Sequence, residues 1–245
     1  MKYLERKIVE NERISEDIFV LSVTWNRTKV KAGQFFMLKC WGTELTLMRP
    51  ISVFSADDKL VTFMYRIVGK GTQKLSKMKP GDKLWLLGPC GNGYPCESLS
   101  GKVAVVGGGV GIPPLYYTAK TLTCSGVDVE AYLGFRDELF AVDDFSTYCE
   151  NLFVSSENGP EGYHGYITDL LKPGQYDAVL TCGPEVMMRK VAKMCAETGT
   201  DCYCSLEHRM ACGLGACLGC SIRTKQGMKR VCKDGPVFKS TDLLW

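Results

Sequence analysis

The sequence has little histidine and no long apolar run. Only two of its 245 residues are histidine, too few for metal sites built mainly from imidazole. No apolar run approaches the ~20 residues of a membrane-spanning helix. The start, Met1–Lys7, also lacks the apolar stretch of a secretory signal peptide. These absences lead us to expect a cytoplasmic protein with no membrane partner.

Basic residues are only slightly in excess. The net charge is +3, and all of it falls in residues 201–245, so residues 1–200 balance to zero. A nucleic-acid-binding protein usually carries a stronger basic bias, and we expect no nucleic-acid partner. The chain is 45% hydrophobic and 23% charged, which is typical of a globular protein. Its length allows one large domain or two modest ones.

Cysteine, by contrast, is abundant, with 13 residues. The number is odd and nothing indicates export, so a disulfide scaffold is not expected. Nine cysteines are scattered, one of them Cys182. The other four form the run Cys212-x4-Cys217-x2-Cys220-x11-Cys232, which matches the plant-type ligand spacing of a [2Fe–2S] cluster.

Structural zinc is the alternative to this cluster, although zinc sites usually contain two paired cysteine knuckles. Only one C-x2-C pair is present, and Cys202-x-Cys204 is the other pair available for a zinc site. A Rieske centre needs two histidine ligands, and neither His164 nor His208 has the required spacing. Gly213, Gly215 and Gly219 are expected to provide the tight turns of the loop. The fourth thiolate is expected on a returning strand, 229–232.

Residues 1–97 read as short strands separated by turns, which is typical of an antiparallel barrel. One short helix is expected at Thr72–Met78. From Lys102 to about residue 200, buried strands alternate with helices, which indicates a doubly wound parallel sheet. Helices are expected at Pro113–Leu122, Ile167–Leu171 and Pro184–Glu197, and strands at 103–106, 127–133, 152–155 and 178–181. The alternation is expected to end near Asp201, where a glycine- and cysteine-rich region begins. The predicted units are therefore 1–97, 98–200 and 201–245.

Two motifs of the barrel region indicate a flavin site. Arg49-Pro50-Ile51-Ser52 can pair an arginine with a pyrophosphate and offer a hydroxyl to a ring. About sixteen residues later comes the stretch Tyr65–Thr72, in which Gly71-Thr72 opens the expected short helix, whose N–H groups can bind an anion. Each motif alone is weak, and an ordinary turn would also explain the first. Their combination on one barrel is more specific.

Two motifs of the parallel-sheet region indicate a nucleotide site. Gly107, Gly108, Gly109 and Gly111 follow a strand and open a helix, so the backbone can approach a pyrophosphate. Cys182-Gly183-Pro184 likewise lies between a strand and a helix. For coenzyme choice, Glu157 after the third strand favours NADH, whereas Arg136 after the second strand leaves NADPH open.

Together these motifs resemble the ferredoxin–NADP reductase family. With the C-terminal cysteine loop added, the whole chain is similar to the electron-transfer subunits of class 1B dihydroorotate dehydrogenases. The resemblance implies a six-stranded FAD-binding barrel and a second domain that binds the nicotinamide nucleotide. It places Cys182 near the nicotinamide, as a catalytic residue that positions hydride transfer, although a buried thiol without a role fits that residue equally well. It also implies that the FAD is lined by three groups of residues: Arg49, Pro50, Ile51 and Ser52; Arg66, Ile67 and Val68; Gly71 and Thr72.

The function implied is an electron relay in pyrimidine biosynthesis. NADH would reduce FAD, and the two electrons would pass singly through the [2Fe–2S] cluster to an FMN-containing catalytic subunit, in a heterotetramer of two copies of each chain. An alternative is an NAD(P)H-linked subunit of a hydrogenase or of an NADH–ferredoxin transhydrogenase complex. A more distant one is a non-enzymatic adaptor stabilised by zinc.

Overall fold

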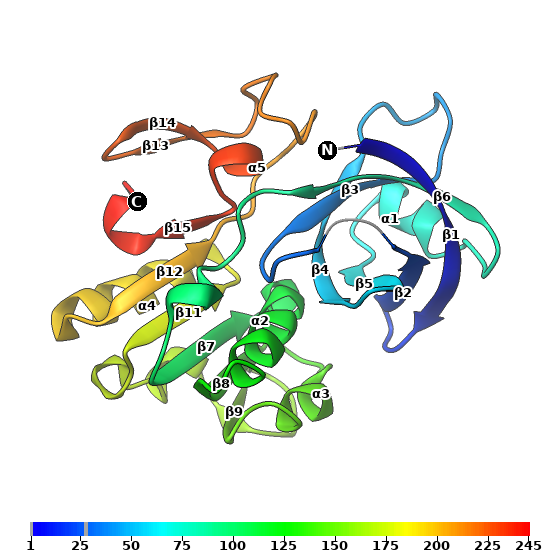
Figure 1. The fold of residues 1–245 in the computed structure, drawn as a ribbon. Helices are drawn as coiled ribbons and strands as arrows, with labels where there is room; N and C mark the ends of the chain where they lie inside the picture. The colour runs from blue at the N-terminus through cyan, green and yellow to red at the C-terminus, as the bar shows by residue number, and fades with distance from the viewer. Residues whose placement is uncertain (1, 27–28) are drawn as a thin grey trace.

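The structure is a computed structural model that describes residues 2–26 and 29–245. Figure 1 shows three parts: a barrel formed by the N-terminal residues, a parallel sheet with flanking helices, and a C-terminal segment above that sheet. Among the described residues, no helix is long and apolar enough to cross a membrane. The expected combination of a β barrel with an α/β domain is confirmed.

The barrel is closed by six antiparallel strands in the order β1-β2-β5-β4-β3-β6. The strands are β1 (Lys2–Arg13), β2 (Ile18–Thr24), β3 (Phe35–Lys39), β4 (Arg49–Ala56), β5 (Leu60–Arg66) and β6 (Lys83–Cys90). Alternate side chains of these strands point inward, and Phe36, Phe63 and Leu84 are fully buried inside. The barrel therefore has a packed interior, and a cofactor has to bind on its outer surface or rim.

The short helix of the barrel, α1 (Lys70–Leu75), begins two residues before the expected Thr72 and ends three before Met78. Thr72 Oγ1 accepts hydrogen bonds from the backbone N–H groups of Val68 and Gly69, at 3.0 and 3.3 Å, which supports the earlier start. The N–H groups of Lys77 and Met78 bond to carbonyls three residues back. The last turn is thus of the tighter 3₁₀ type, which explains the earlier end.

The second sheet has seven strands in the order β10-β9-β8-β7-β11-β12-β15. These are β7 (Lys102–Gly108), β8 (Asp128–Phe135), β9 (Asn151–Ser156), β10 (Tyr163–His164), β11 (Ala178–Cys182), β12 (Asp201–Ser205) and β15 (Val237–Lys239). All neighbours pair in parallel except β12 with β15. The expected parallel sheet is confirmed.

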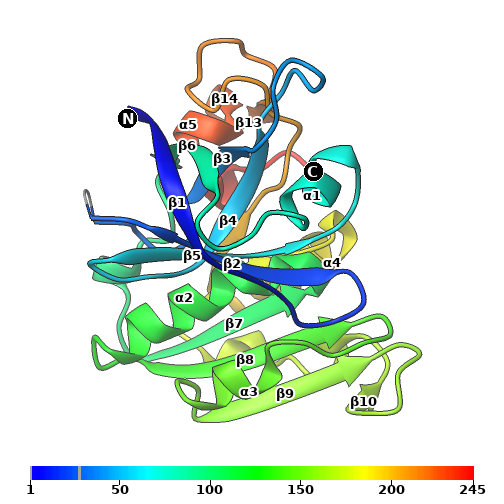
Figure 2. The same cartoon turned by 90° about the vertical axis from the view of Figure 1, so that its right-hand side faces the viewer.

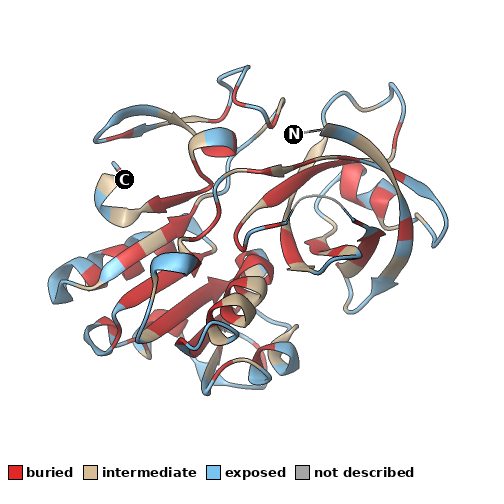
Figure 3. Ribbon diagram, viewed as in Figure 1, coloured by how far each residue is buried: buried red, intermediate tan, exposed pale blue. Residues whose placement is uncertain are grey.

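Helices cover both faces of this sheet, which is the doubly wound arrangement (Figures 1 and 2). The helices are α2 (Pro113–Thr123), α3 (Val142–Ser146) and α4 (Glu185–Thr198). Val103 and Val105 of β7 pack with α2, whereas Ala104 and Val106 pack with α4. This alternation follows from the two-residue period of a strand. It explains why β7 is apolar on both faces (Figure 3).

Two details of the sheet differ from expectation. The alternation does not end at Asp201, because β12 continues the sheet beside β11. The helix expected at Ile167–Leu171 is one 3₁₀ turn, η3 (Ile167–Asp169). Asp169 accepts a bond from the Tyr166 N–H, and the backbone reaches Pro173 before a second turn can form. The remaining 3₁₀ turns are η1 (Cys96–Ser98), η2 (Gly109–Gly111), η4 (Pro173–Gln175) and η5 (Ser240–Asp242).

The C-terminal segment contains a hairpin, β13 (Ser221–Thr224) and β14 (Gly227–Arg230), followed by α5 (Val231–Asp234). The strand expected over 229–232 therefore stops at Arg230, and Cys232 lies in a helical turn.

The barrel and the sheet are joined by apolar contact. Phe54 of β4 stacks on Tyr116 of α2 with ring centroids 4.5 Å apart, and the buried Tyr94 hydroxyl donates to the Thr181 carbonyl at 3.0 Å.

Candidate functional site

The four clustered cysteines lie on one loop and on α5, between the barrel and the hairpin (Figure 1). Cys220 and Cys232 are buried, Cys212 is half-buried and Cys217 is exposed. Backbone N–H groups point at their sulfurs: Gly215 N lies 3.1 Å from Cys232 Sγ, and Leu214 N lies 3.4 Å from Cys212 Sγ. Hydrogen bonds of this kind stabilise thiolate ligands and tune a cluster.

The four thiols fall into two pairs. Cys217 N lies 3.5 Å from Cys212 Sγ, and Cys232 N lies 3.4 Å from Cys220 Sγ. Burial, together with the neighbouring Cys220, raises the pKa of Cys232 to about 12. Burial also acts to raise the pKa of Cys212, but N–H groups of Cys217 and Leu214 lower it to about 6. In the described part of the chain, no three His, Cys, Asp or Glu side chains surround a single metal position. Two thiol pairs fit a two-iron cluster, in which each iron takes two thiolates.

The backbone of the loop differs from expectation at one position. Gly213 and Gly215 have φ of +65° and +77°, as the tight turns require, but the third left-handed residue is Leu218 with φ of +59° and not Gly219. A Cβ on Gly213 would lie 2.6 Å from Met37 Cγ and 3.8 Å from Cys90 Sγ. The loop therefore lies directly against the barrel.

Arg230 fixes the far side of the loop. Its guanidinium pairs with both carboxylate oxygens of Asp234 at 3.0 and 3.2 Å and donates to the Gly215 carbonyl at 3.1 Å. The Arg230 guanidinium lowers the pKa of Asp234. This planar arrangement connects β14 and α5 to the turn that carries the N–H donor to Cys232.

The predicted flavin residues gather at one rim of the barrel. Arg49 begins β4, and a Cβ on Gly71 would lie only 2.6 Å from its Nε atom. The Arg49 guanidinium also lies over the Trp41 ring, 5.1 Å from its centroid. Val68 is 81% exposed, an apolar surface that a bound ring would cover. The structure thus joins the two motifs in one cradle that a side chain at Gly71 would disturb.

Other predicted flavin residues have more varied positions. Pro50, Ile51 and Ser52 lie half-buried in β4, paired with β3, and Ile51 packs against the barrel core. Arg66 ends β5, pairs with Asp17 at 3.1 Å and lines the large cavity described next. Direct contact of each residue with FAD stays a prediction.

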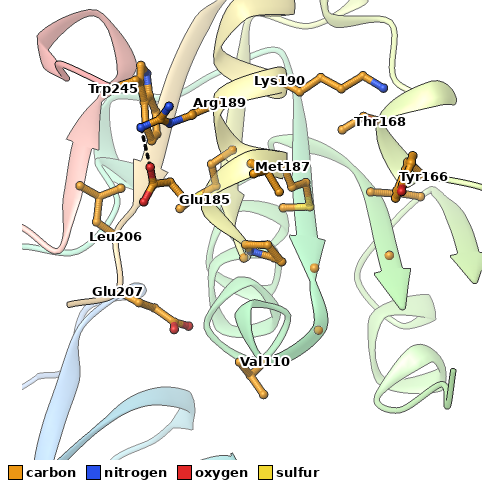
Figure 4. Close-up of a pocket in the computed structure, with 18 of the residues that line it drawn as sticks. Val110, Tyr166, Thr168, Glu185, Met187, Arg189, Lys190, Leu206, Glu207 and Trp245 are labelled. Atoms are coloured by element: carbon orange, nitrogen blue, oxygen red, sulfur yellow. Dashed lines mark ion pairs between the residues drawn. The ribbon is translucent and has the colours of Figure 1, made fainter. Parts of the chain in front are cut away.

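A cavity of about 1140 Å³ opens at the carboxyl ends of the parallel strands. This edge is where open α/β sheets bind their ligands. Figure 4 shows side chains from η3, from α4, from the turn after β7 and from the segment after β12 surrounding it. Its lining includes Gly108, Gly109, Ser155, Glu157, Tyr166, Thr168, Met187, Lys190, Glu207 and Trp245. A cavity of this size matches a large ligand such as a dinucleotide.

The four predicted nucleotide glycines have two different roles. Gly108 and Gly109 line the cavity. A Cβ on Gly107 would lie 2.9 Å from Ile112 Cγ1, and one on Gly111 would lie 2.5 Å from the Cys182 carbonyl carbon. Gly108 and Gly109 can therefore face a ligand, whereas Gly107 and Gly111 let α2 pack closely on the sheet.

Cys182 ends β11 with its side chain buried, and it is not among the residues that line the cavity. Burial, together with the nearby Glu207 carboxylate, raises the pKa of this thiol above its ordinary range. The thiol therefore stays protonated and neutral. Its proximity to a nicotinamide stays a prediction.

Several cavity residues have no sequence motif. The Ser155 and Thr168 hydroxyls are buried and find no hydrogen-bond partner in the described chain. Burial raises the pKa of the Glu207 carboxyl, which also lines the cavity. Buried polar atoms without partners normally carry an explanation such as a ligand. The positions of Glu157 and Arg136 after strands were the available sequence signals for this end of the cavity.

Family comparisons agree with these features. Residues 207–244 match the family described as the iron-sulfur cluster binding domain of dihydroorotate dehydrogenase B, and residues 5–94 match the oxidoreductase FAD-binding domain family. A solved NADH-dependent reduced ferredoxin-NADP oxidoreductase, studied for flavin-based electron bifurcation, superposes with a TM-score of 0.88 at 30% identity over 98% of this chain and 90% of its own. A ferredoxin NADP+ reductase from Neisseria gonorrhoeae, at 18% identity and a TM-score of 0.62, shares the fold.

Similar proteins cover nearly the full length. The dihydroorotate dehydrogenase B (NAD(+)) electron transfer subunit of Clostridium acetobutylicum is 46% identical over 99% of this chain and 98% of its own. The subunit of the same name from Clostridium perfringens is 42% identical with the same coverage. The chain belongs to the family of dihydroorotate dehydrogenase B (NAD(+)) electron transfer subunits.

Proposed function

We propose that this chain carries electrons between NADH and the catalytic subunit of a dihydroorotate dehydrogenase, in pyrimidine biosynthesis. The observation that carries the proposal is the position of the cysteine loop. It packs against Met37 and Cys90 of the barrel, and the segment after β12 connects the cavity to this loop. The nucleotide cavity, the flavin rim and the cluster loop would then belong to one folded unit, with Arg66 at the end of β5 lining the cavity.

Bound FAD would accept two electrons as a hydride and release them one at a time, which the one-electron cluster requires. The protein's part is to hold these groups. Arg49 and the N-terminus of α1 would bind the pyrophosphate of FAD, and Val68 would lie against the cofactor. Cys212, Cys217, Cys220 and Cys232 would hold the [2Fe–2S] cluster. Gly108 and Gly109 would let the NADH pyrophosphate approach the backbone after β7.

NADH is favoured over NADPH at the nucleotide cavity. Glu157 lines the cavity after β9, where a carboxylate can accept a hydrogen bond from a ribose hydroxyl and repel a 2′-phosphate. Arg136 lines the same end, but its side chain is 81% exposed and lies 3.8 Å from Asp137.

The partner would be an FMN-containing catalytic subunit that interconverts dihydroorotate and orotate, assembled as two copies of each chain. The exposed edge of the cluster loop supports a docking surface there: Cys217 is exposed, and Leu214 and Leu218 are 46% and 61% exposed. Electron transfer needs the cluster near its acceptor, and exposed apolar side chains favour protein contact. We place the complex in the cytoplasm, since the described cysteines form no disulfide.

A ferredoxin-linked NADH oxidoreductase is the second candidate, favoured by the TM-score of 0.88 to the bifurcating enzyme. The iron–sulfur family match, together with the two thiol pairs, argues against the zinc adaptor. The electron acceptor distinguishes the two remaining functions. A ferredoxin that accepts electrons from the NADH-reduced chain faster than the FMN subunit does would favour the second candidate.

The test uses the complex of this chain with the catalytic subunit. Cys217→Ser should retain FAD reduction by NADH and lose transfer to the catalytic subunit by at least about tenfold. Cys124→Ser, at an exposed cysteine outside the loop, is the control and should transfer normally. Unchanged onward transfer in Cys217→Ser would overturn the proposed order of carriers.

A further inference from the structure

The nucleotide cavity has one end with an unusual arrangement of charge. Five ionisable side chains occupy this end, at the carboxyl ends of β8 and β9 and beside η3 and α4: Arg136, Asp137, Glu157, Asp169 and Lys190. Arg136, Glu157 and Lys190 line the cavity itself. Figure 4 shows Lys190, Thr168 and Tyr166 together on this side, away from Arg189 and Trp245.

Lys190, on α4, is held by Asp169. Its ammonium lies 2.7 Å from Asp169 Oδ1. The other oxygen, Asp169 Oδ2, accepts the Tyr166 backbone N–H at 3.3 Å, so the carboxylate is fixed to the backbone of η3. The hydrogen bond from Lys190 lowers the pKa of Asp169. At neutral pH Asp169 is therefore ionised and holds the Lys190 ammonium in the ion pair.

The second cation of this end also has an acidic neighbour. Arg136 Nε lies 3.8 Å from Asp137 Oδ2, and Asp137 is held by the Asn158 amide at 3.0 Å. Glu157, in contrast, forms no ion pair with any residue in 2–26 or 29–245. Three carboxylates and two cations give this end a net charge of −1, and neither cation is unpaired.

Neutral hydroxyl groups complete this end. Ser155 and Thr168 are 1% and 2% exposed, both line the cavity, and their hydroxyl oxygens lack a partner within the described chain. Hydroxyls satisfy neutral donors and acceptors such as those of a ribose or a base. Two such buried groups indicate that a polar, uncharged part of a ligand belongs here.

We propose that Asp169 is a coenzyme-specificity residue, which excludes NADPH by holding Lys190 in an ion pair while Glu157 repels the 2′-phosphate. The inference rests on the proposed nucleotide site and adds how that site discriminates. A 2′-phosphate brings about two negative charges to an end that is already negative and has no unpaired cation. A free 2′-hydroxyl meets the Glu157 carboxylate as a hydrogen-bond acceptor.

The test compares binding of 5′-ADP with that of 2′,5′-ADP to the FAD-loaded chain by calorimetry. These two probes report on the adenosine end alone and do not depend on turnover. Asp169→Asn should release Lys190 and raise the affinity for 2′,5′-ADP relative to 5′-ADP about fivefold or more. Adding Glu157→Gln should raise this ratio further, and adding Lys190→Ala to Asp169→Asn should return it to the wild-type value.

The matched control is Glu185→Gln. It makes the same change in charge and also releases a cation of α4, Arg189, from a 2.6 Å ion pair at the other end of the cavity. Its affinity ratio should stay within about twofold of wild type. An unchanged ratio in a folded Asp169→Asn variant would overturn the specificity role, as would an equal rise in Glu185→Gln. Failure of the wild-type chain to bind either probe would instead reject the proposed nucleotide site.

Discussion

Single residues decide how closely backbone and cofactor can approach each other. Gly71, in α1, lies against the Arg49 side chain with no room for a Cβ, whereas Gly69, two residues earlier, has open space around the position of a Cβ. The same residue type therefore has different consequences within one turn. Gly71 matters through the position of the Arg49 guanidinium, whose charge would pair with a pyrophosphate.

Gly71→Ala should lower FAD affinity about tenfold, because the new methyl group displaces Arg49; tenfold corresponds to about 1.4 kcal/mol. Gly69→Ala is the matched control and should retain FAD. The measurement is the dissociation constant of FAD, obtained by fluorescence on refilling the stripped protein. Equal affinities in the two variants would contradict this role for Arg49.

The sequence predicts the four cysteines as cluster ligands because their spacing is local. Cys212, Cys217 and Cys220 lie on one loop, and glycines mark its turns. The pairing of Lys190 with Asp169 was not predictable, since it joins a helix to a 3₁₀ turn 21 residues away. Likewise, nothing in the glycine run distinguishes Gly108, which faces the cavity, from Gly107, which faces α2. These distinctions depend on packing between elements and not on local pattern.

At the scale of elements, a buried polar network fixes the register of the parallel strands. The Glu130 carboxylate on β8 accepts hydrogen bonds from Lys102 Nζ at 2.8 Å, from Asn151 Nδ2 at 2.7 Å and from the Tyr176 hydroxyl. These partners lie on β7, at the start of β9 and next to β11. Burial by itself raises the pKa of Glu130, but these hydrogen bonds outweigh burial and lower it.

Glu130→Gln should reduce the free energy of unfolding by about 2 kcal/mol at pH 7, because charge-assisted hydrogen bonds are lost in a buried position. A lowered carboxyl pKa stabilises the fold above its ordinary value of about 4.3 and loses that stabilisation as pH falls through the lowered pKa. The difference in the free energy of unfolding between wild type and Glu130→Gln should therefore be largest above about pH 5 and should decrease below about pH 4.

Urea unfolding at several pH values measures this difference in the free energy of unfolding. Glu97→Gln, which removes an exposed ion pair with Lys31 at 3.4 Å, is the control and should change stability by less than about 1 kcal/mol. If the difference between wild type and Glu130→Gln stays constant down to pH 3, the Glu130 charge does not stabilise the strands.

The elements themselves were largely predictable, and their ends were not. The apolar run of β7 predicted a buried parallel strand because both of its faces are covered. β12 was missed because its sequence, Asp201–Ser205, alternates cysteine with polar and aromatic residues. Its place beside β11 follows from the sheet as a whole, which the local sequence does not specify.

At the scale of the whole molecule, the cluster loop lies between the barrel and an exposed apolar edge. Leu218 has φ of +59° and is 61% exposed, so it is held in an uncommon conformation at the surface. An exposed leucine in this position adds little to the stability of the isolated chain. Its value would come from contact with the catalytic subunit.

Leu218→Asp should weaken association with the catalytic subunit at least about tenfold, because a charge would be buried in an apolar contact. The fold should persist, since aspartate tolerates a positive φ better than most residues. Ile14→Asp, at a 45% exposed residue in the turn between β1 and β2, should bind normally. Surface plasmon resonance with immobilised catalytic subunit measures both variants, and equal affinities would place the docking surface elsewhere.

We propose above all that this one chain passes electrons from NADH through FAD to a [2Fe–2S] cluster. Anaerobic addition of NADH to the purified chain, followed by visible absorption and electron paramagnetic resonance, tests it most directly. Loss of flavin absorbance should come first, and the signal of a one-electron-reduced cluster should follow. A colourless protein that contains zinc, or a chain whose flavin is reduced without any cluster signal, would contradict the claim.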